Sequence, residues 1–177
     1  MSETGIPTNA GLHAGTLRTV DLTIMGEGRF KATNLRGGVL PIGQGEDPDF
    51  TPVELLLAAL AGCGAIDLEW VTKKRAPFTA FAARAQGHKV RDEQGSHLVQ
   101  LSVTLDVQFP DDEGGDQARE VVPRTLQQIQ DRLCTVSRTV AIGEPVGYVQ
   151  GSVEPQTAHG AEDRDETESS VGSLPTS

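Results

Sequence analysis

The sequence predicts an α+β domain in which helices pack against antiparallel strands. Three observations support this fold class. Apolar and polar residues alternate over residues 99–109, which is typical of a long strand with one face in water. Residues 51–75 carry the start and stop signals of a long helix. The predicted elements follow in the order βββαββαβ, which favours helices packed on an antiparallel sheet.

Three short strands are predicted before the long helix. Residues 16–24 carry regularly spaced apolar side chains, and residues 29–35 follow a glycine-containing link. Residues 37–42 come after a hairpin turn. Because Pro41 has no backbone N–H to donate, we expect this third strand to lie at a sheet edge or to end there.

The helix that begins after residue 51 has the clearest local signal in the chain. Thr51 is a favoured N-cap, Pro52 occupies the first helical position, and Glu54 follows three residues after the cap, which predicts a capping box. We expect the helix to reach the basic residues 73–75, whose charge suits its C-terminal end. Apolar residues nearly encircle it over residues 55–66, so we expect a buried central helix.

Four further elements are predicted after this helix. Strands are expected over residues 78–90 and 99–109, followed by a second helix over residues 116–133. Pro123 is expected to kink or split that second helix. A final strand is expected over residues 146–153, which contain three valines and a tyrosine.

The two ends of the chain differ from its middle in composition. Residues 1–15 and the acidic tail over residues 154–177 contain few large apolar side chains, so we expect both to be disordered. This leaves one folded domain over residues 16–153. The N-terminus lacks the apolar stretch of a signal peptide, and the apolar run over residues 55–66 is too short to span a bilayer. We therefore expect a cytoplasmic protein that does not bind a membrane.

Charge and cysteine content narrow the function further. The formal net charge is −10, which argues against nucleic-acid binding because phosphate contacts need clustered Lys and Arg. The chain has two cysteines, Cys63 and Cys134, and Cys134 stands just before a predicted short turn over residues 135–139. The cysteine spacing matches no metal motif and the four histidines are scattered, so we expect neither a metal nor a cofactor.

The two cysteines are open to two interpretations. Free cysteine is commonly a small apolar packing residue. The functional alternative is a redox pair, in which one thiol attacks a substrate and the other resolves the product. Cys63 lies well beyond the first helical turn, so its thiolate would need a nearby cation. Arginine suits this role because it stays charged when desolvated, and the candidates are Arg29, Arg36 and Arg138.

Three sequence motifs resemble one known family. The stretch TPVELLLAALAGC, followed by AID, and the stretch CTVSRT are similar to the cysteine motifs of the OsmC/Ohr family of thiol-dependent peroxidases. The stretch GEGRFKAT also matches the family pattern, and the resemblance covers about residues 18–152. It is nearer to the broader OsmC-like branch than to Ohr proper. The resemblance implies antiparallel sheets wrapped around a long central helix, in an intertwined homodimer with two sites at the interface.

The resemblance also implies a reaction. Family members of this kind reduce organic hydroperoxides, alkyl or lipid, in defence against oxidative stress. By matching position, Cys63 resembles the peroxidatic cysteine, Cys134 the resolving cysteine, and Arg29 the arginine that holds the thiolate and the peroxide. The implied cycle passes through a Cys63 sulfenic acid and a Cys63–Cys134 disulfide. A dithiol reductant of the lipoyl type would then regenerate the thiols.

One position departs from the family pattern. Ohr-type enzymes use a glutamate ten residues before the cysteine to orient the arginine, and here that position is Val53. Glu54 could take this role for Arg29, although it lies on the far side of a straight helix from Cys63 and has the capping role. Asp67, one turn after Cys63, is a second candidate, although its charge would oppose thiolate formation. The alternative function is a non-catalytic OsmC-like module that binds a small hydrophobic ligand in the dimer-interface pocket.

Overall fold

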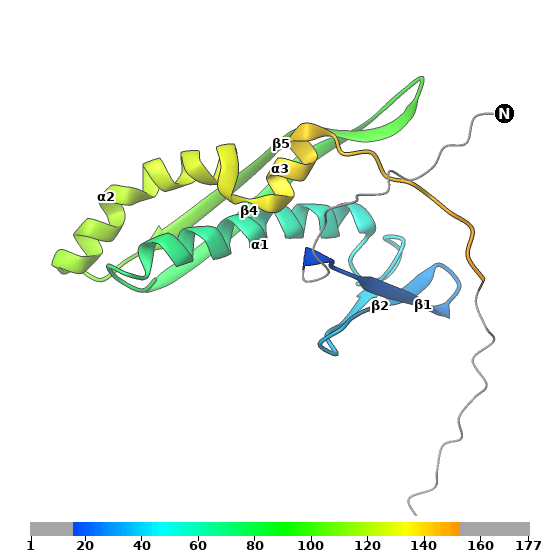
Figure 1. The fold of residues 1–177 in the computed structure, drawn as a ribbon, viewed down its shortest axis with the longest axis horizontal. Coiled ribbons are helices and arrows are strands. Elements are labelled where there is room, and N and C mark those ends of the chain that lie inside the picture. The colour runs from blue at the N-terminus through cyan, green and yellow to red at the C-terminus, as the bar shows by residue number, and fades with distance from the viewer. Residues whose placement is uncertain (1–15, 153–177) are drawn as a thin grey trace, which may run out of the picture. The chain divides into compact units, whose positions relative to one another are not determined.

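The structure is a computed structural model that describes residues 16–152. The disordered ends expected over residues 1–15 and 154–177 lie outside the described residues. The chain divides into two compact units, one ending at Pro145 and the other beginning at Val146. Within the described residues, all helices and strands belong to the first unit, which has the predicted α+β character (Figure 1).

The first three strands form one antiparallel sheet in the order β1-β2-β3. They span Val20–Gly26, Arg29–Asn34 and Val39–Ile42, close to the predicted ranges. Pro41 lies in the edge strand β3 opposite Lys31, which confirms the expectation that its strand would lie at an edge. The apolar side chains of β1 are exposed in the single chain, so this sheet has one surface without a cover from the same chain.

Helix α1 spans Pro52–Thr72, and its predicted capping box is present. The backbone N–H of Thr51 donates to Oε2 of Glu54 at 2.8 Å, and the backbone N–H of Glu54 donates to Oγ1 of Thr51 at 3.3 Å. These two bonds satisfy backbone donors that the start of a helix otherwise leaves unpaired. The helix therefore begins where its local sequence predicts.

The expectation that α1 would be buried all round is wrong for the single chain. Its buried residues are spaced four apart, at Leu60, Gly64, Leu68 and Thr72, and so form one stripe. Trp70, by contrast, has 59% of its surface exposed. One stripe is covered because the chain supplies the β4–β5 hairpin, α2 and α3 on only one side of the helix (Figure 1).

Among residues 16–152, α1 is also the one helix whose length and apolar content would allow it to cross a membrane. Core helices of folded domains meet the same criterion. Here the helix carries Asp67 and Glu69 along its length and packs one stripe against the rest of the domain. We therefore interpret α1 as a core helix.

A long antiparallel hairpin lies along α1. It consists of β4, Ala80–Asp92, and β5, Gly95–Gln108. The alternation predicted for β5 is interrupted by a bulge, where Gln100 has a positive φ of 52°. Beyond the bulge, Leu98 and Leu101 both line a small cavity against the N-terminal end of α1. The inward face of β5 is therefore not the unbroken odd-numbered series that the sequence predicts, because a bulge shifts the side-chain alternation.

The second helix, α2, spans Glu113–Gln128 and continues into a π-helical turn, η2, over Ile129–Leu133. Asp112 is its N-cap and accepts a hydrogen bond from the backbone N–H of Gly115 at 2.8 Å. Pro123 lies inside α2, which does not split there. The helix is irregular six residues later, at the π turn, which contacts α1 and α3.

The segment after Cys134 is a helix, α3, over Thr135–Ile142, and not the short turn that the sequence predicts. Cys134 is its N-cap, and Gly143 ends it with a left-handed φ of 63°. The strand expected over residues 146–153 is also wrong for the described part of that range, since residues 146–152 have no strand structure. A strand forms only where its backbone pairs with another strand, and no strand of the described chain pairs with this segment.

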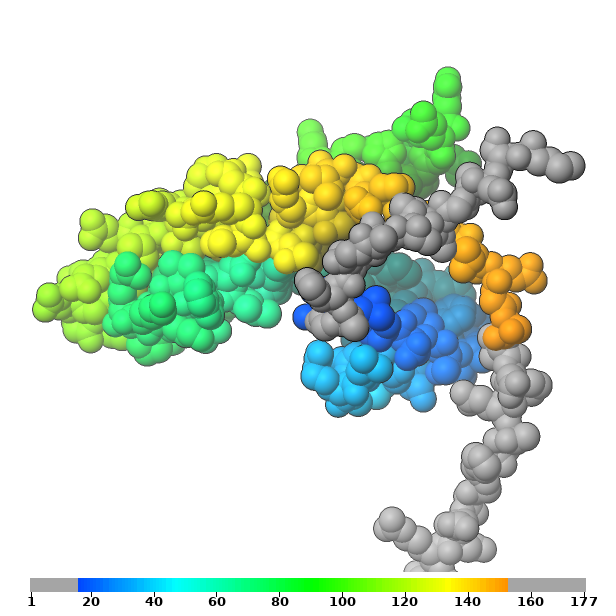
Figure 2. All heavy atoms as spheres, in the orientation of Figure 1, coloured from blue at the N-terminus to red at the C-terminus, as the bar shows by residue number. Residues whose placement is uncertain are grey.

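The core of the first unit lies between α1, the hairpin and the end of α2. One buried cluster consists of Leu68, Ile129 and Cys134, and a second consists of Ala76, Phe109 and Ala118. Figure 2 shows the side chains of α1 and α2 in continuous contact on the face in view. The first cluster brings the second cysteine into the same core as the middle of α1.

Candidate functional site

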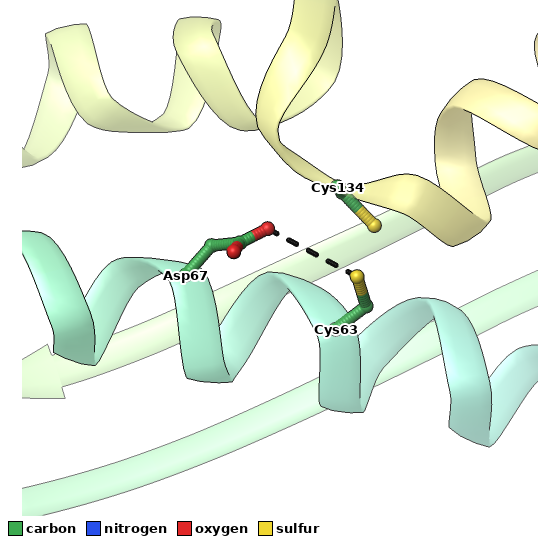
Figure 3. A group of neighbouring side chains, drawn as sticks. All are labelled: Cys63, Asp67 and Cys134. Atoms are coloured by element: carbon green, nitrogen blue, oxygen red, sulfur yellow. Dashed lines mark hydrogen bonds between the residues drawn. The ribbon is translucent and has the colours of Figure 1, made fainter. Parts of the chain in front are cut away.

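The fold brings the two cysteines together with one carboxylate. Cys63 lies in the middle of α1, Asp67 lies one turn later, and Cys134 joins η2 to α3. One donor atom from each residue lies within 4.8 Å of the other two. Figure 3 shows the three side chains pointing toward one another across the gap between the two segments. Both cysteines are free thiols in the structure.

The π turn has a direct part in placing Cys134. The backbone N–H of Cys134 donates to the carbonyl oxygen of Ile129 at 3.3 Å, which closes the wide turn. Cys134 then adopts an extended conformation and leaves the helix beside α1. Its side chain is buried, with only 1% of its surface exposed, whereas Cys63 is half-buried. Cys63 is therefore the thiol that a solute reaches more easily.

The environment of Cys134 favours its thiolate. Burial alone would raise the pKa of Cys134, but hydrogen bonds from Cys63, from the side chain and backbone of Ser137, and from the backbone of Val136 together lower it. The backbone N–H of Ser137 donates to Sγ of Cys134 at 3.3 Å. This is the N-cap position of α3, where N–H groups stabilise a negative charge. Ser137 thus stabilises the Cys134 thiolate through both its backbone N–H and its side chain.

The environment of Cys63 favours its protonated thiol. Burial raises the pKa of Cys63, and so do its hydrogen bond to Cys134 and the negative charges of Cys134 and Asp67. Sγ of Cys63 donates to Oδ2 of Asp67 at 3.9 Å. The pair is therefore asymmetric: the less accessible Cys134 is the better thiolate, and the more accessible Cys63 retains the proton.

Asp67 has an unusual position for a carboxylate. It is half-buried on an apolar helix, and burial raises its pKa. Within residues 16–152 no ion pair involves Asp67. The Cys63 thiol donates a hydrogen bond to it. The sequence placed Asp67 on the same face as Cys63, and the structure confirms that arrangement.

Arg29 pairs with carboxylates and not with a cysteine in the single chain. Its Nη2 lies 2.5 Å and its Nε 3.0 Å from Oδ2 of Asp49. Oδ2 of Asp47 lies 3.8 Å from its Nε. The hydrogen bond and charge of Asp49 raise the pKa of Arg29. The predicted contact between Arg29 and Cys63 stays a prediction that the single chain does not contain.

The sequence analysis missed the carboxylates that hold Arg29. Asp47 and Asp49 immediately precede the start of α1, and the backbone N–H of Asp49 donates to Oδ1 of Asp47 at 2.9 Å. The sequence does contain a signal for them, namely two acidic residues just ahead of the N-cap Thr51, which could have been recognised as partners for an arginine. Glu54, the expected partner of Arg29, instead accepts hydrogen bonds from the backbone N–H and the hydroxyl of Thr51 at the start of the helix.

A cavity of about 620 Å³ lies beside the thiol pair. Aliphatic side chains of α1, β5, α2 and η2 contribute to its wall, among them Leu60, Leu105 and Ile129. Ile129 also packs in the core cluster with Cys134, and Ser137 is both a cavity residue and the hydrogen-bond donor to that cysteine. The cavity therefore shares walls with the thiol site.

Comparison with known proteins decides the family. A family model described as OsmC-like protein matches residues 43–148, more than half of the chain. The chain belongs to the OsmC-like family. The resemblance seen in the sequence is thus confirmed, and the family includes enzymes that reduce hydroperoxides. No curated protein matches the chain.

Two solved structures of OsmC-like proteins share the fold at low sequence identity, and a third chain is similar at a lower score. An OsmC-like protein of unknown function from Vibrio cholerae is 13% identical, with a TM-score of 0.57, over 70% of this chain and 93% of that one. An OsmC-like protein from Mycoplasma pneumoniae is 12% identical, with a TM-score of 0.55, over 71% and 87%. The organic hydroperoxide resistance protein OhrB of Bacillus subtilis is 20% identical, with a TM-score of 0.46, over 71% and 92%.

Proposed function

We propose that this OsmC-like protein is a cysteine-based peroxidase that reduces organic hydroperoxides through Cys63 and Cys134. The observation that supports the proposal most is the approach of two cysteines from distant parts of the chain. Their sulfurs lie within 4.8 Å of each other beside a cavity whose wall is partly aliphatic. Two thiols so close, one of them stabilised as a thiolate, are suited to forming a disulfide.

The asymmetry of the pair suggests how the first step begins. The Cys134 thiolate takes the proton of Cys63, and the Cys63 thiolate so formed attacks an oxygen of the hydroperoxide. The O–O bond breaks, Cys63 becomes a sulfenic acid, and the leaving alkoxide takes a proton from water to give the alcohol. Cys63 is the attacking thiol because it is the more exposed of the two.

The second step forms the disulfide. Cys134 loses its proton, and its thiolate attacks the sulfur of the Cys63 sulfenic acid. Hydroxide leaves, takes up that proton and becomes water, which replaces the water that protonated the alkoxide. In sum, one hydroperoxide, one thiol and one thiolate give one disulfide, one alcohol and one hydroxide. A dithiol of the lipoyl type would then reduce the disulfide by thiol–disulfide exchange.

Arg29 is the proposed stabiliser of the thiolate and of the developing alkoxide. We further propose that it acts across an intertwined homodimer. In the single chain the side chain of Arg29 is 45% exposed, and the apolar residues Leu22, Ile66 and Trp70 are exposed as well. A second copy of the chain would cover these apolar side chains and could bring Arg29 to the partner's thiol pair.

Two carboxylates are candidates to orient Arg29. Glu54 is the residue that stands nearest to the family position, and Asp49 is the residue that holds Arg29 in the single chain. Substitution of each by its amide distinguishes them. If Glu54→Gln slows peroxide reduction while Asp49→Asn does not, Glu54 has the orienting role, and the reverse result assigns the role to Asp49.

The aliphatic part of the cavity wall suggests the substrate. Aliphatic walls favour alkyl or lipid hydroperoxides over hydrogen peroxide, because apolar surface gains from leaving water. OsmC-like proteins are generally soluble, and we propose a cytoplasmic protein that limits oxidative stress. Nucleic acid and membranes are not proposed as partners.

Peroxide turnover tests the proposal. The assay follows consumption of cumene hydroperoxide and of hydrogen peroxide with dihydrolipoamide as reductant. We expect faster turnover of cumene hydroperoxide, loss of turnover in Cys63→Ser, and a trapped sulfenic acid at Cys63 in Cys134→Ser. Arg29→Lys should slow the reaction, while Arg84→Lys, an exposed control on β4, should not. A Cys63→Ser variant as active as the parent would refute the proposal.

A second candidate function is ligand binding without catalysis. The observations that favour it are the 620 Å³ cavity and the raised pKa of Cys63, which disfavours the nucleophilic thiolate. In this case a fluorescent apolar probe would bind and be displaced by a fatty acid in both the parent and Cys63→Ser. Neither protein would then consume hydroperoxide.

A further inference from the structure

The three side chains of the thiol site form a set of metal-ion donors. Sγ of Cys63, a carboxylate oxygen of Asp67 and Sγ of Cys134 all lie within 4.8 Å of one another. Figure 3 shows that they converge on one space, with Cys63 and Asp67 on α1 and Cys134 facing them from the other segment. The sequence expectation of no metal rested on the absence of a local motif, which does not test donors that the fold brings together.

The spacing of the donors suits a tetrahedral ion. Zinc bonds of about 2.3 Å to sulfur and 2.0–2.2 Å to oxygen place two ligands of a tetrahedron roughly 3.5–3.8 Å apart. Sγ of Cys63 and Oδ2 of Asp67 are already 3.9 Å apart. The sulfur of Cys134 would need to approach the other two donors by about 1.3 Å at most, a shift of the size that side-chain rotation supplies.

The charge of Asp67 is the second observation that points to a cation. Its carboxylate is half-buried next to two thiols, and in the described part of the chain it has no ion-pair partner. A carboxylate at this position opposes formation of the Cys63 thiolate, so thiol chemistry alone gives it no favourable role. A divalent cation would be attracted by all three negative charges and would offset two of them, which leaves a net charge of −1.

We propose that the reduced protein binds one Zn²⁺ through Cys63, Asp67 and Cys134. Two thiolates and one carboxylate are a ligand set that zinc accepts, and water would complete the tetrahedron. Cys63 and Asp67 are both partly exposed, which gives the ion a route of entry from solvent. Because both sulfurs are ligands, the disulfide form of the protein has no such site. The inference does not depend on peroxidase activity.

Direct metal binding tests this inference. Reduced protein, freed of metal, is titrated with Zn²⁺ by calorimetry, and with Co²⁺ while the sulfur-to-cobalt charge-transfer absorption is recorded. We expect one ion per chain and a thiolate–cobalt band that Zn²⁺ removes. Protein oxidised to the disulfide with diamide should bind neither ion at this site.

Variants identify the ligands. Cys63→Ser and Cys134→Ser should weaken the cobalt band, and Asp67→Asn should weaken Zn²⁺ binding by at least about tenfold. Glu69→Gln, an exposed acid on the same helix, should leave binding unchanged. Asp67→Asn keeps both thiols and a similar shape, and far-UV circular dichroism reports whether it is folded. Unchanged affinity in folded Asp67→Asn, or cobalt binding without a thiolate band, would overturn the proposal.

Discussion

Replacement of Leu68 by alanine should destabilise the domain strongly. Leu68 has no exposed surface and packs in the core cluster with Ile129 and Cys134. It therefore joins the middle of α1 to the segment that carries the second cysteine. The substitution removes apolar atoms at the point where these two parts of the candidate site meet.

The expected magnitude follows from this burial. Loss of three buried carbon atoms costs roughly 2.4 kcal/mol at about 0.8 kcal/mol each. The cavity left behind adds to this cost, and fully buried Leu→Ala changes commonly cost about 2–5 kcal/mol in total. For a domain of this size, each kcal/mol lowers Tm by roughly 2–4 °C. A loss of about 3 kcal/mol and a fall in Tm of roughly 6–12 °C are therefore expected.

Urea unfolding followed by far-UV circular dichroism measures this effect, at fixed protein concentration because an oligomer would make stability concentration-dependent. Glu69→Ala is the matched control, since Glu69 is an exposed neighbour on α1 and alanine favours helix. The control should change stability by no more than about 0.5 kcal/mol. A loss below about 1 kcal/mol for Leu68→Ala would contradict the packing of Leu68 against the Cys134 segment.

Three further outcomes are expected. Thr51→Ala should lower the free energy of unfolding by about 1 kcal/mol in urea without slowing hydroperoxide reduction, and a slower reaction would indicate that the cap shapes the site. Hydrogen bonds from Thr51 lower the pKa of Glu54, so the ionised carboxylate is the form that stabilises the cap. The contribution of the cap to the free energy of unfolding should therefore be complete above the ordinary glutamate pKa of about 4.3, and it should be lost as the pH falls through the lowered pKa. Parallel urea midpoints of parent and Thr51→Ala across this range check that sign, and a difference that grows in acid would reverse it. Gly64→Ala should be tolerated or should stabilise the domain by up to about 1 kcal/mol, because its Cβ would lie 3.6 Å from the nearest side chain. Gly115→Ala should destabilise the domain, because its Cβ would lie 1.8 Å from the carbonyl oxygen of Pro110. Thermal melts of the two glycine variants test the contrast, which equal effects would contradict.

The elements that the sequence predicts well are those with local causes. Thr51, Pro52 and Glu54 form a cap through bonds among neighbours in the chain, so their spacing was sufficient. The edge position of Pro41 likewise follows from the lack of a backbone donor. The OsmC-like fold itself was predicted from motif resemblance and agrees with the family match.

The errors arise where distant parts of the chain decide the structure. Pro123 does not split its helix, and the π turn at residues 129–133 adjoins the core shared by α1 and α3. Residues 146–152 read as a strand but have no pairing strand among the described residues. The exposed sides of α1 show that apolar composition predicts burial without saying which chain provides the cover.

Some features of the candidate site could be predicted from the sequence, and others depend on parts of the chain that are far apart. The approach of Cys63 and Cys134 agrees with the pairing that the resemblance implied, and Asp67 lies on the face that helical spacing predicted. The environments that favour the Cys134 thiolate and the Cys63 thiol depend on the start of α3 and on burial. The environment of Cys134 was not visible in the sequence, because residues 135–139 were read as a turn, whereas the opposing charge of Asp67 near Cys63 was expected from helical spacing.

The most direct test of the central claim is a single-turnover oxidation. Reduced protein receives one equivalent of cumene hydroperoxide, after which intact mass, peptide mapping and released cumyl alcohol are measured. The account predicts loss of two hydrogen atoms per chain, a peptide pair linking Cys63 to Cys134, and one equivalent of alcohol. Recovery of both free thiols with the hydroperoxide unconsumed would contradict it.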